Sequence, residues 1–161
     1  MLGPVAAPTH AASTRQSLAG RWRFEIDRDN RGLSERWFDR TLTGNLQLPG
    51  ALQNQGFGDD IAVNTAWTGD VGADHWRKRP EYAPYREPGH IKVPFFLQPA
   101  KHYVGAVWYQ RLITIPAAWA GRRVTLMLER PHWETRVWLD DRPLGTNDSL
   151  STPHVYDLGA A

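Results

Sequence analysis

The chain has 161 residues, which suffice for one domain with a sizeable core, and its formal net charge is only +2. A hydrophobic content of 41% with 8 Trp excludes a disordered chain, and the short, scattered basic clusters argue against a nucleic-acid partner. The lack of cysteine excludes disulfides and thiolate sites, and no apolar run approaches the roughly 20 residues that span a membrane.

Residues 1–16 are expected to form a flexible leader, and residues 17–161 a single domain. The leader is rich in Ala and Pro but lacks the basic start and long apolar stretch of a secretory signal. It fits either the tail of a trimmed export signal or a simple leader. The sequence therefore does not determine the cellular compartment, and the periplasm and secretion are candidates. The abrupt end after residue 158 suggests a boundary within a longer protein.

The first elements are short strands. From Trp22 to Ile26 apolar and charged side chains alternate, which predicts a strand over residues 21–27 with Trp22, Phe24 and Ile26 facing inward. Residues 29–37 read as a loop or single helical turn, and residues 45–48 as a second short strand.

Residues 50–100 form a long insertion without sustained periodicity. Its prolines prevent long helices, yet its many Trp, Tyr and Phe residues make it too aromatic for a disordered linker. We therefore expect an ordered, aromatic-rich loop. Within it, Asp59 and Asp60 are either a cation-binding pair or a solvated turn.

From residue 105 onward, period-two patterning predicts several strands. Apolar residues alternate with polar ones through residues 124–128 and 133–139, a V-W-L-D-D-x-x-x-G hairpin follows, and T-P-x-x-Y-D-L closes the set. Glu129 and Arg130 are expected to form a buried or half-buried ion pair at a strand end. His154 is expected to be a hydrogen-bonded structural residue, since no second His stands at metal-ligand spacing.

The order of these landmarks resembles the N-terminal sugar-binding domain of glycoside hydrolase family two, which includes β-galactosidases, β-glucuronidases and β-mannosidases. The matching positions are Trp108-Tyr109, Arg111, Pro116, Trp119, Val137-Trp138, Gly145, Pro153 and Asp157-Leu158. The resemblance implies an all-β, galactose-binding-domain-like jelly-roll β-sandwich over about residues 18–158. Several short strands with Gly and Pro turns favour a sandwich or barrel independently.

The same resemblance implies a non-catalytic accessory role. In that family both catalytic Glu residues lie on a separate (β/α)₈ barrel, which needs about 250 residues. We therefore expect this chain to form one wall of the sugar pocket of a β-glycosidase, with a catalytic barrel domain as partner and a β-glycoside as ligand. No catalytic residue, cofactor or metal is predicted. The alternatives are a stand-alone carbohydrate-binding module or lectin, and a structural protein-interaction domain.

The closing loop, residues 145–152, is the first binding candidate, with Asn147, Asp148 and Ser149 as its polar residues. Such side chains donate to and accept from sugar hydroxyls. In the galactosidase branch of the resembling family an acidic residue on this loop reaches the sugar site; its slot falls on Ser149 here, one residue after Asp148. The alternative is an Asx-type turn that caps its own backbone.

The insertion provides the second candidate. Flat aromatic rings with polar neighbours can bind sugar rings, and the candidates are Trp67, Asp70, His75 and Trp76. The alternative is that these Trp side chains fill a small core beneath the loop.

Overall fold

The computed structural model describes residues 14–67, 78–92 and 99–161. The strands are β1 (Gly20–Asp27), β2 (Gly44–Leu48), β3 (Ala106–Gln110), β4 (Arg123–Leu128), β5 (Thr135–Leu139), β6 (Arg142–Asn147) and β7 (His154–Ala160). The 3-10 helices are η1 (Trp37–Asp39), η2 (Gln53–Gln55), η3 (Pro80–Arg86) and η4 (Ala117–Trp119). The strands divide between two compact units, with β1 to β3 in one and β4 to β7 in the other.

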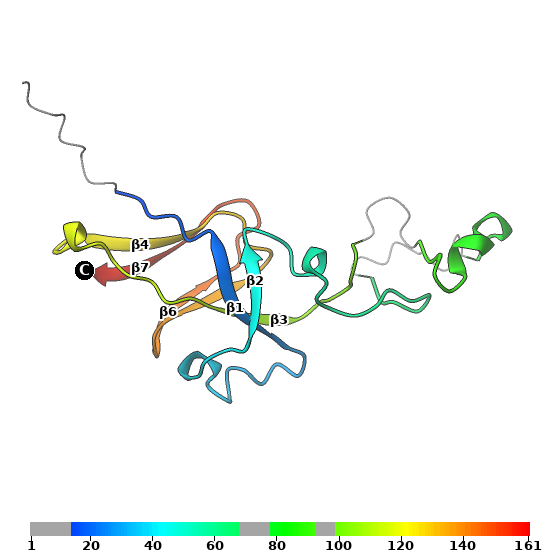
Figure 1. Ribbon diagram of the computed structural model, residues 1–161, viewed down its shortest axis with the longest axis horizontal. Helices are drawn as coiled ribbons and strands as arrows, with labels where there is room; N and C mark the ends of the chain where they lie inside the picture. The colour runs from blue at the N-terminus through cyan, green and yellow to red at the C-terminus, as the bar shows by residue number, and fades with distance from the viewer. Residues whose placement is uncertain (1–13, 68–77, 93–98) are drawn as a thin grey trace, which may run out of the picture. The chain divides into compact units, whose positions relative to one another are not determined.

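The unit that contains β1 is built on an antiparallel sheet of order β2-β1-β3 (Figure 1). Its core consists of Phe24, Leu46 and Leu52, and the ring of Phe57 packs edge-on against Phe24 at 4.5 Å between centroids. Trp22 and Ile26 pack against this core, which confirms the predicted inward face of the first strand. Truncating a buried phenylalanine such as Phe24 typically costs about 3–5 kcal/mol, so this small core contributes substantially to stability.

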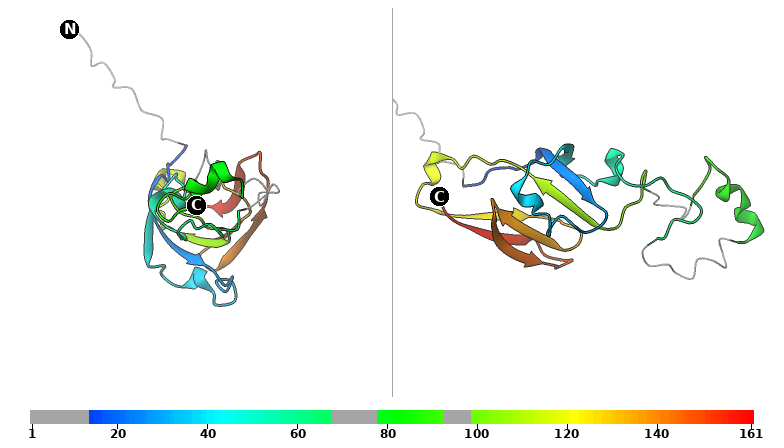
Figure 2. Two further views of the ribbon diagram at one scale, coloured as in Figure 1. Left: turned by 90° about the vertical axis from the view of Figure 1, so that its right-hand side faces the viewer. Right: turned by 90° about the horizontal axis from the view of Figure 1, so that it is seen from below.

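The other unit contains two antiparallel pairs, β4-β7 and β5-β6. Strands β4 and β7 run side by side (Figure 1 and the right-hand view of Figure 2). The predicted hairpin is confirmed as β5 and β6, joined through Asp140 and Asp141. Asp140 has a φ of 54°, a left-handed conformation that Asp tolerates better than most residues. Opposite Val137, Gly145 has a φ of 125°, which only glycine adopts without strain.

Two expectations for this unit are wrong. Glu129 and Arg130 are both exposed, and neither forms an ion pair within the described part of the chain. Trp133 is 62% exposed, because strand β5 begins only at Thr135 and the alternating pattern does not extend back to the tryptophan. Glu134, just before β5, pairs with Arg136 of that strand at 2.7 Å.

The fold class is confirmed. Every strand pair in the described residues is antiparallel, and the helices found there are short 3-10 turns, as in an all-β sandwich. Within the same residues no helix has the length and apolar character needed to cross a membrane. The jelly-roll strand order and the single-domain boundaries stay predictions.

Candidate functional site

The closing loop connects β6 to β7 and is held by its own polar side chains. Asn147 Oδ1 accepts a hydrogen bond from the backbone N–H of Ser149 at 3.0 Å, which is an Asx turn. Ser149 Oγ in turn accepts from the backbone N–H of Thr152 at 3.3 Å and from its hydroxyl at 2.8 Å. The turn chemistry considered from the sequence is therefore present at Asn147 and Ser149.

Asp148 differs from its two neighbours. It lies between them on the turn, its side chain is exposed, and no hydrogen bond or ion pair engages its carboxylate within the described residues. The position that the family resemblance points to, Ser149, is used to hold the loop. The one acidic side chain of the loop is therefore presented to solvent by a turn that its neighbours stabilise.

The base of the loop rests on a buried polar cluster. His154, at the start of β7, is fully buried, with Nδ1 2.6 Å from Thr135 Oγ1 and Nε2 2.8 Å from the carbonyl oxygen of Ser149. Tyr156, two residues further along β7, is also buried, and its hydroxyl donates to the Thr135 carbonyl at 3.0 Å. The prediction that His154 is a hydrogen-bonded structural residue is confirmed.

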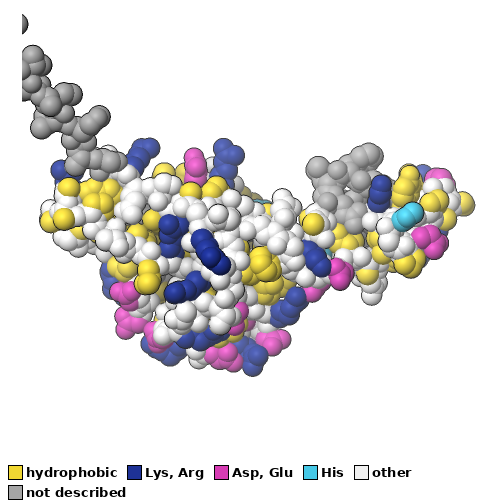
Figure 3. Space-filling model, in the orientation of Figure 1, with side chains coloured by type: hydrophobic (Ala, Val, Ile, Leu, Met, Phe, Trp, Pro, Cys, Tyr) yellow, Lys and Arg dark blue, Asp and Glu magenta, His cyan; other side chains and the backbone are white. Residues whose placement is uncertain are grey.

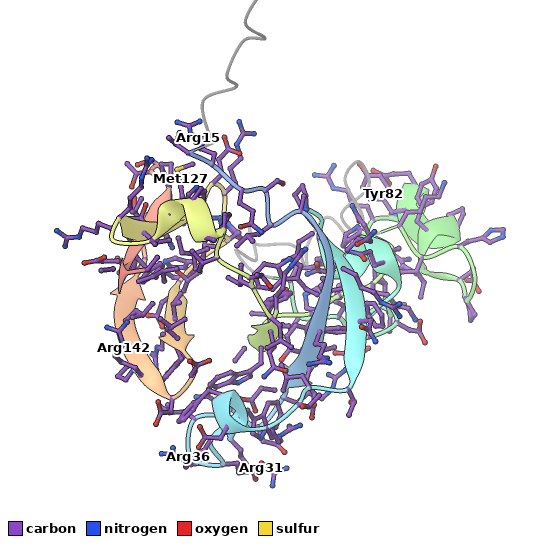
Figure 4. All side chains as sticks on the ribbon, turned by 60° about the vertical axis from the view of Figure 1, so that its left-hand side comes forward. Arg15, Arg31, Arg36, Tyr82, Met127 and Arg142 are labelled. Atoms are coloured by element: carbon purple, nitrogen blue, oxygen red, sulfur yellow. The ribbon has the colours of Figure 1, made fainter. Side chains whose placement is uncertain are left out.

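An exposed ion pair links strands β4 and β7. Arg123 binds the carboxylate of Asp157 through Nε at 3.0 Å, and this hydrogen bond and charge lower the pKa of Asp157. Arg142 of β6, labelled in Figure 4, donates to the carbonyl of Leu158 on β7 at 2.9 Å.

The second candidate region is described only in part. Asp70, His75 and Trp76 lie outside the described residues. Trp67 lies within them, half-buried, with its ring edge-on against His102 at 4.9 Å between centroids. Its indole nitrogen is buried, and no residue of the described ranges forms a hydrogen bond with it. Contact with His102 favours the packing interpretation for Trp67.

Asp59 and Asp60 are each engaged by a different cation. Both carboxylate oxygens of Asp59 receive Arg28, at 3.0 and 2.8 Å, and this bonding lowers the pKa of Asp59. Lys101 binds Asp60 at 2.5 Å. Across residues 14–67, 78–92 and 99–161 no group of three metal-type ligands occurs. Both carboxylates are exposed and each forms an ion pair, an arrangement that was not predicted from the sequence.

Sequence reasoning missed a buried carboxylate at the end of β1. Asp27 is 3% exposed and accepts hydrogen bonds from the backbone N–H groups of Arg31 at 2.8 Å and Gly32 at 2.7 Å, and from the indole of Trp108 at 3.1 Å. Burial alone would raise the pKa of Asp27, but the three donors outweigh it, so that pKa lies below its usual range. The Asp-x-x-x-x-Gly spacing was the available signal.

This anion organises the loop after β1. A side chain on Gly32 would place its first carbon 2.1 Å from Trp108 Nε1, so the loop reaches the indole only because residue 32 is glycine. Arg31, on the solvent side of the same loop (Figure 4), pairs with Glu35 at 3.2 Å. Asp27 is therefore a structural anchor.

A shallow hollow of about 220 Å³ lies beside η3, and sequence reasoning missed it as well. Its lining is Pro84, Tyr85, Gly89, His90 and Lys92. The hollow is open to solvent and mainly apolar.

Charges of both signs are mixed on the surface. On the face shown in Figure 3, Lys and Arg side chains lie among Asp and Glu, in keeping with the small net charge.

These features define an all-β protein with a polar loop that presents one carboxylate. No family model matches the chain. It is 23% identical over 143 residues to a β-glucuronidase from Paenibacillus borealis, and 24% identical over 149 residues to a β-galactosidase large subunit from Leuconostoc lactis. Each alignment covers 89% of this chain but only 18% and 22%, respectively, of the relative.

The fold comparison points the same way. A solved β-glucuronidase from an uncultured Clostridium sp. matches with a TM-score of 0.58 and 16% identity, over 96% of this chain and 21% of that chain. The predicted resemblance to family-two glycoside hydrolases is thereby confirmed, and so is the fold class. The relatives are glycosidases, and this chain corresponds to about a fifth of their length.

Proposed function

We propose that this chain is a non-catalytic sugar-binding domain of a β-glycosidase, which forms one wall of a sugar pocket that a (β/α)₈ catalytic domain completes. The observation that carries the proposal is Asp148, an exposed carboxylate without a partner in the described residues, on a loop whose other polar groups hold it in place. A carboxylate accepts charge-assisted hydrogen bonds from sugar hydroxyls. The names of the relatives support a glycoside as the ligand.

Three of the chain's 17 acidic residues lie in surroundings that disfavour a role as proton donor. A glycosidase acid needs a raised pKa in order to hold its proton near neutral pH. The pKa values of Asp27, Asp59 and Asp157 are all lowered, because hydrogen-bond donors engage each group. These three carboxylates act as anchors and ion-pair partners, and none of them suits the role of proton donor.

The test has two arms on the 161-residue chain. The first measures hydrolysis of nitrophenyl β-galactoside, β-glucuronide and β-mannoside. The second titrates the matching methyl glycosides while the backbone amide NMR signals are followed. We expect no turnover, and weak binding with a Kd above about 10 mM that shifts the signals of Asp148 and its neighbours.

Matched variants assign the contact. Asp148→Asn keeps the size of the side chain and removes its charge, so sugar affinity should fall at least about fivefold, since a hydrogen bond to a charged group contributes more than one to a neutral group. Leu150, 71% exposed on the same loop, provides the control Leu150→Ala, which should leave binding unchanged. Millimolar or tighter binding would favour a stand-alone carbohydrate-binding module, and turnover would overturn the proposal.

A further inference from the structure

The inference concerns the buried ring of His154, both of whose nitrogens are engaged. Nε2 lies 2.8 Å from the Ser149 carbonyl oxygen, and Nδ1 lies 2.6 Å from Thr135 Oγ1. A carbonyl oxygen only accepts, so Nε2 carries a proton and donates it to Ser149. Nδ1 and the Thr135 hydroxyl share the other hydrogen bond. The Ser149 carbonyl thus places a proton on Nε2 of His154.

The hydrogen bonds extend beyond the ring. The Tyr156 hydroxyl donates to the Thr135 carbonyl at 3.0 Å and also lies 2.6 Å from Thr135 Oγ1. Thr135 Oγ1 contacts His154 Nδ1, and His154 Nε2 donates to Ser149. This buried network joins β5, β7 and the closing loop.

We propose that His154 is the positioning residue of the closing loop, acting on Asp148 through the Ser149 carbonyl. Ser149 follows Asp148 directly, and both of its backbone polar groups are held: the N–H by Asn147 at 3.0 Å and the carbonyl by His154 at 2.8 Å. Because the ring of His154 is 0% exposed, it is fixed by the strands around it. The orientation of Asp148 is therefore set from the buried cluster, and its role in sugar binding rests on the proposed function.

Two substitutions separate the two ring nitrogens. In His154→Gln the side-chain amide reaches the position of Nε2 and can donate to Ser149. In His154→Asn the shorter amide reaches only the position of Nδ1, and the bond to Ser149 is lost. Both variants keep a polar group in the buried cluster, so they differ chiefly in the contact with the loop.

The first measurement needs no variant. The ¹⁵N shifts of the His154 imidazole in the wild-type chain should show a proton on Nε2, the nitrogen that faces the Ser149 carbonyl. Amide hydrogen exchange then compares the variants. In His154→Asn the amides of Ser149 and Thr152 should exchange at least about tenfold faster while those of β4 stay protected, and in His154→Gln they should stay near wild type.

The outcomes are distinct. A proton on Nδ1 instead of Nε2, or equal loop protection in His154→Asn and His154→Gln, would overturn the positioning role. If the tautomer and the exchange pattern hold while the wild-type chain shows no sugar-induced shift at Asp148, positioning stands and the proposed sugar function fails. If sugar binds, its affinity should fall in His154→Asn and be restored in His154→Gln, a difference that a general loss of stability would not produce.

Discussion

Replacing Asp27 by Asn tests how the loop after β1 is held to its sheet. The substitution keeps the shape of the side chain, removes its charge and turns one acceptor oxygen into a donor. Oδ2 receives two of the three hydrogen bonds, from Gly32 and Trp108, and Oδ1 receives the third, from Arg31. The least costly orientation of the Asn amide therefore loses the bond to Arg31 and weakens the other two.

The magnitude follows from these contacts. A hydrogen bond to a charged group contributes about 1.5–3 kcal/mol and one between neutral groups about 1 kcal/mol. One bond is lost and two weaken, while the neutral amide is easier to bury than the anion. We expect Asp27→Asn to lower the free energy of unfolding by about 2–4 kcal/mol at pH 7.

The pH dependence has a definite sign. The pKa of Asp27 is lower in the folded chain than in the unfolded chain, so its contribution is fully present above the unfolded value, about 4, and is lost as the pH falls through the folded value. The difference in stability between wild type and Asp27→Asn should therefore be constant near neutrality and shrink below about pH 4.

The assay is urea unfolding followed by tryptophan fluorescence at pH 7 and at about pH 3. Asp148→Asn is the matched control, since the same chemical change at an exposed position without described partners should shift stability by less than about 0.5 kcal/mol. Equal unfolding midpoints for wild type and Asp27→Asn at pH 7, or a difference that does not shrink in acid, would refute the anchoring role of this carboxylate.

Two further substitutions probe the same structure. Gly32→Ala should destabilise by about 2–4 kcal/mol, because the new carbon would lie 2.1 Å from the Trp108 indole, and a wild-type thermal midpoint would show that the loop does not approach Trp108 as described. Arg123→Ala breaks the exposed pair with Asp157 and should leave the urea midpoint nearly unchanged, since solvent screens such pairs, and a large shift would mean that this pair is not screened.

Much of the strand content could be read from the sequence, because alternation is a local property. The inward face of β1 and the β5-β6 hairpin were predicted correctly, and so was the family resemblance. The pattern misled where it ran past a strand end: Trp133 continues the alternation of β5 by position, yet it precedes the strand and is exposed.

The amino-acid sequence alone determined the strand pattern, the hairpin and the polar composition of the closing loop, because each depends on residues close together in the chain. Only the tertiary structure decided which polar side chains form hydrogen bonds and which are presented to solvent. It joined Thr135 to His154 and Trp108 to Asp27, pairs far apart in sequence, and left Asp148 exposed beside the engaged Ser149. The physical reason is that a buried polar group must find its hydrogen-bond partner in space, wherever that partner lies along the chain.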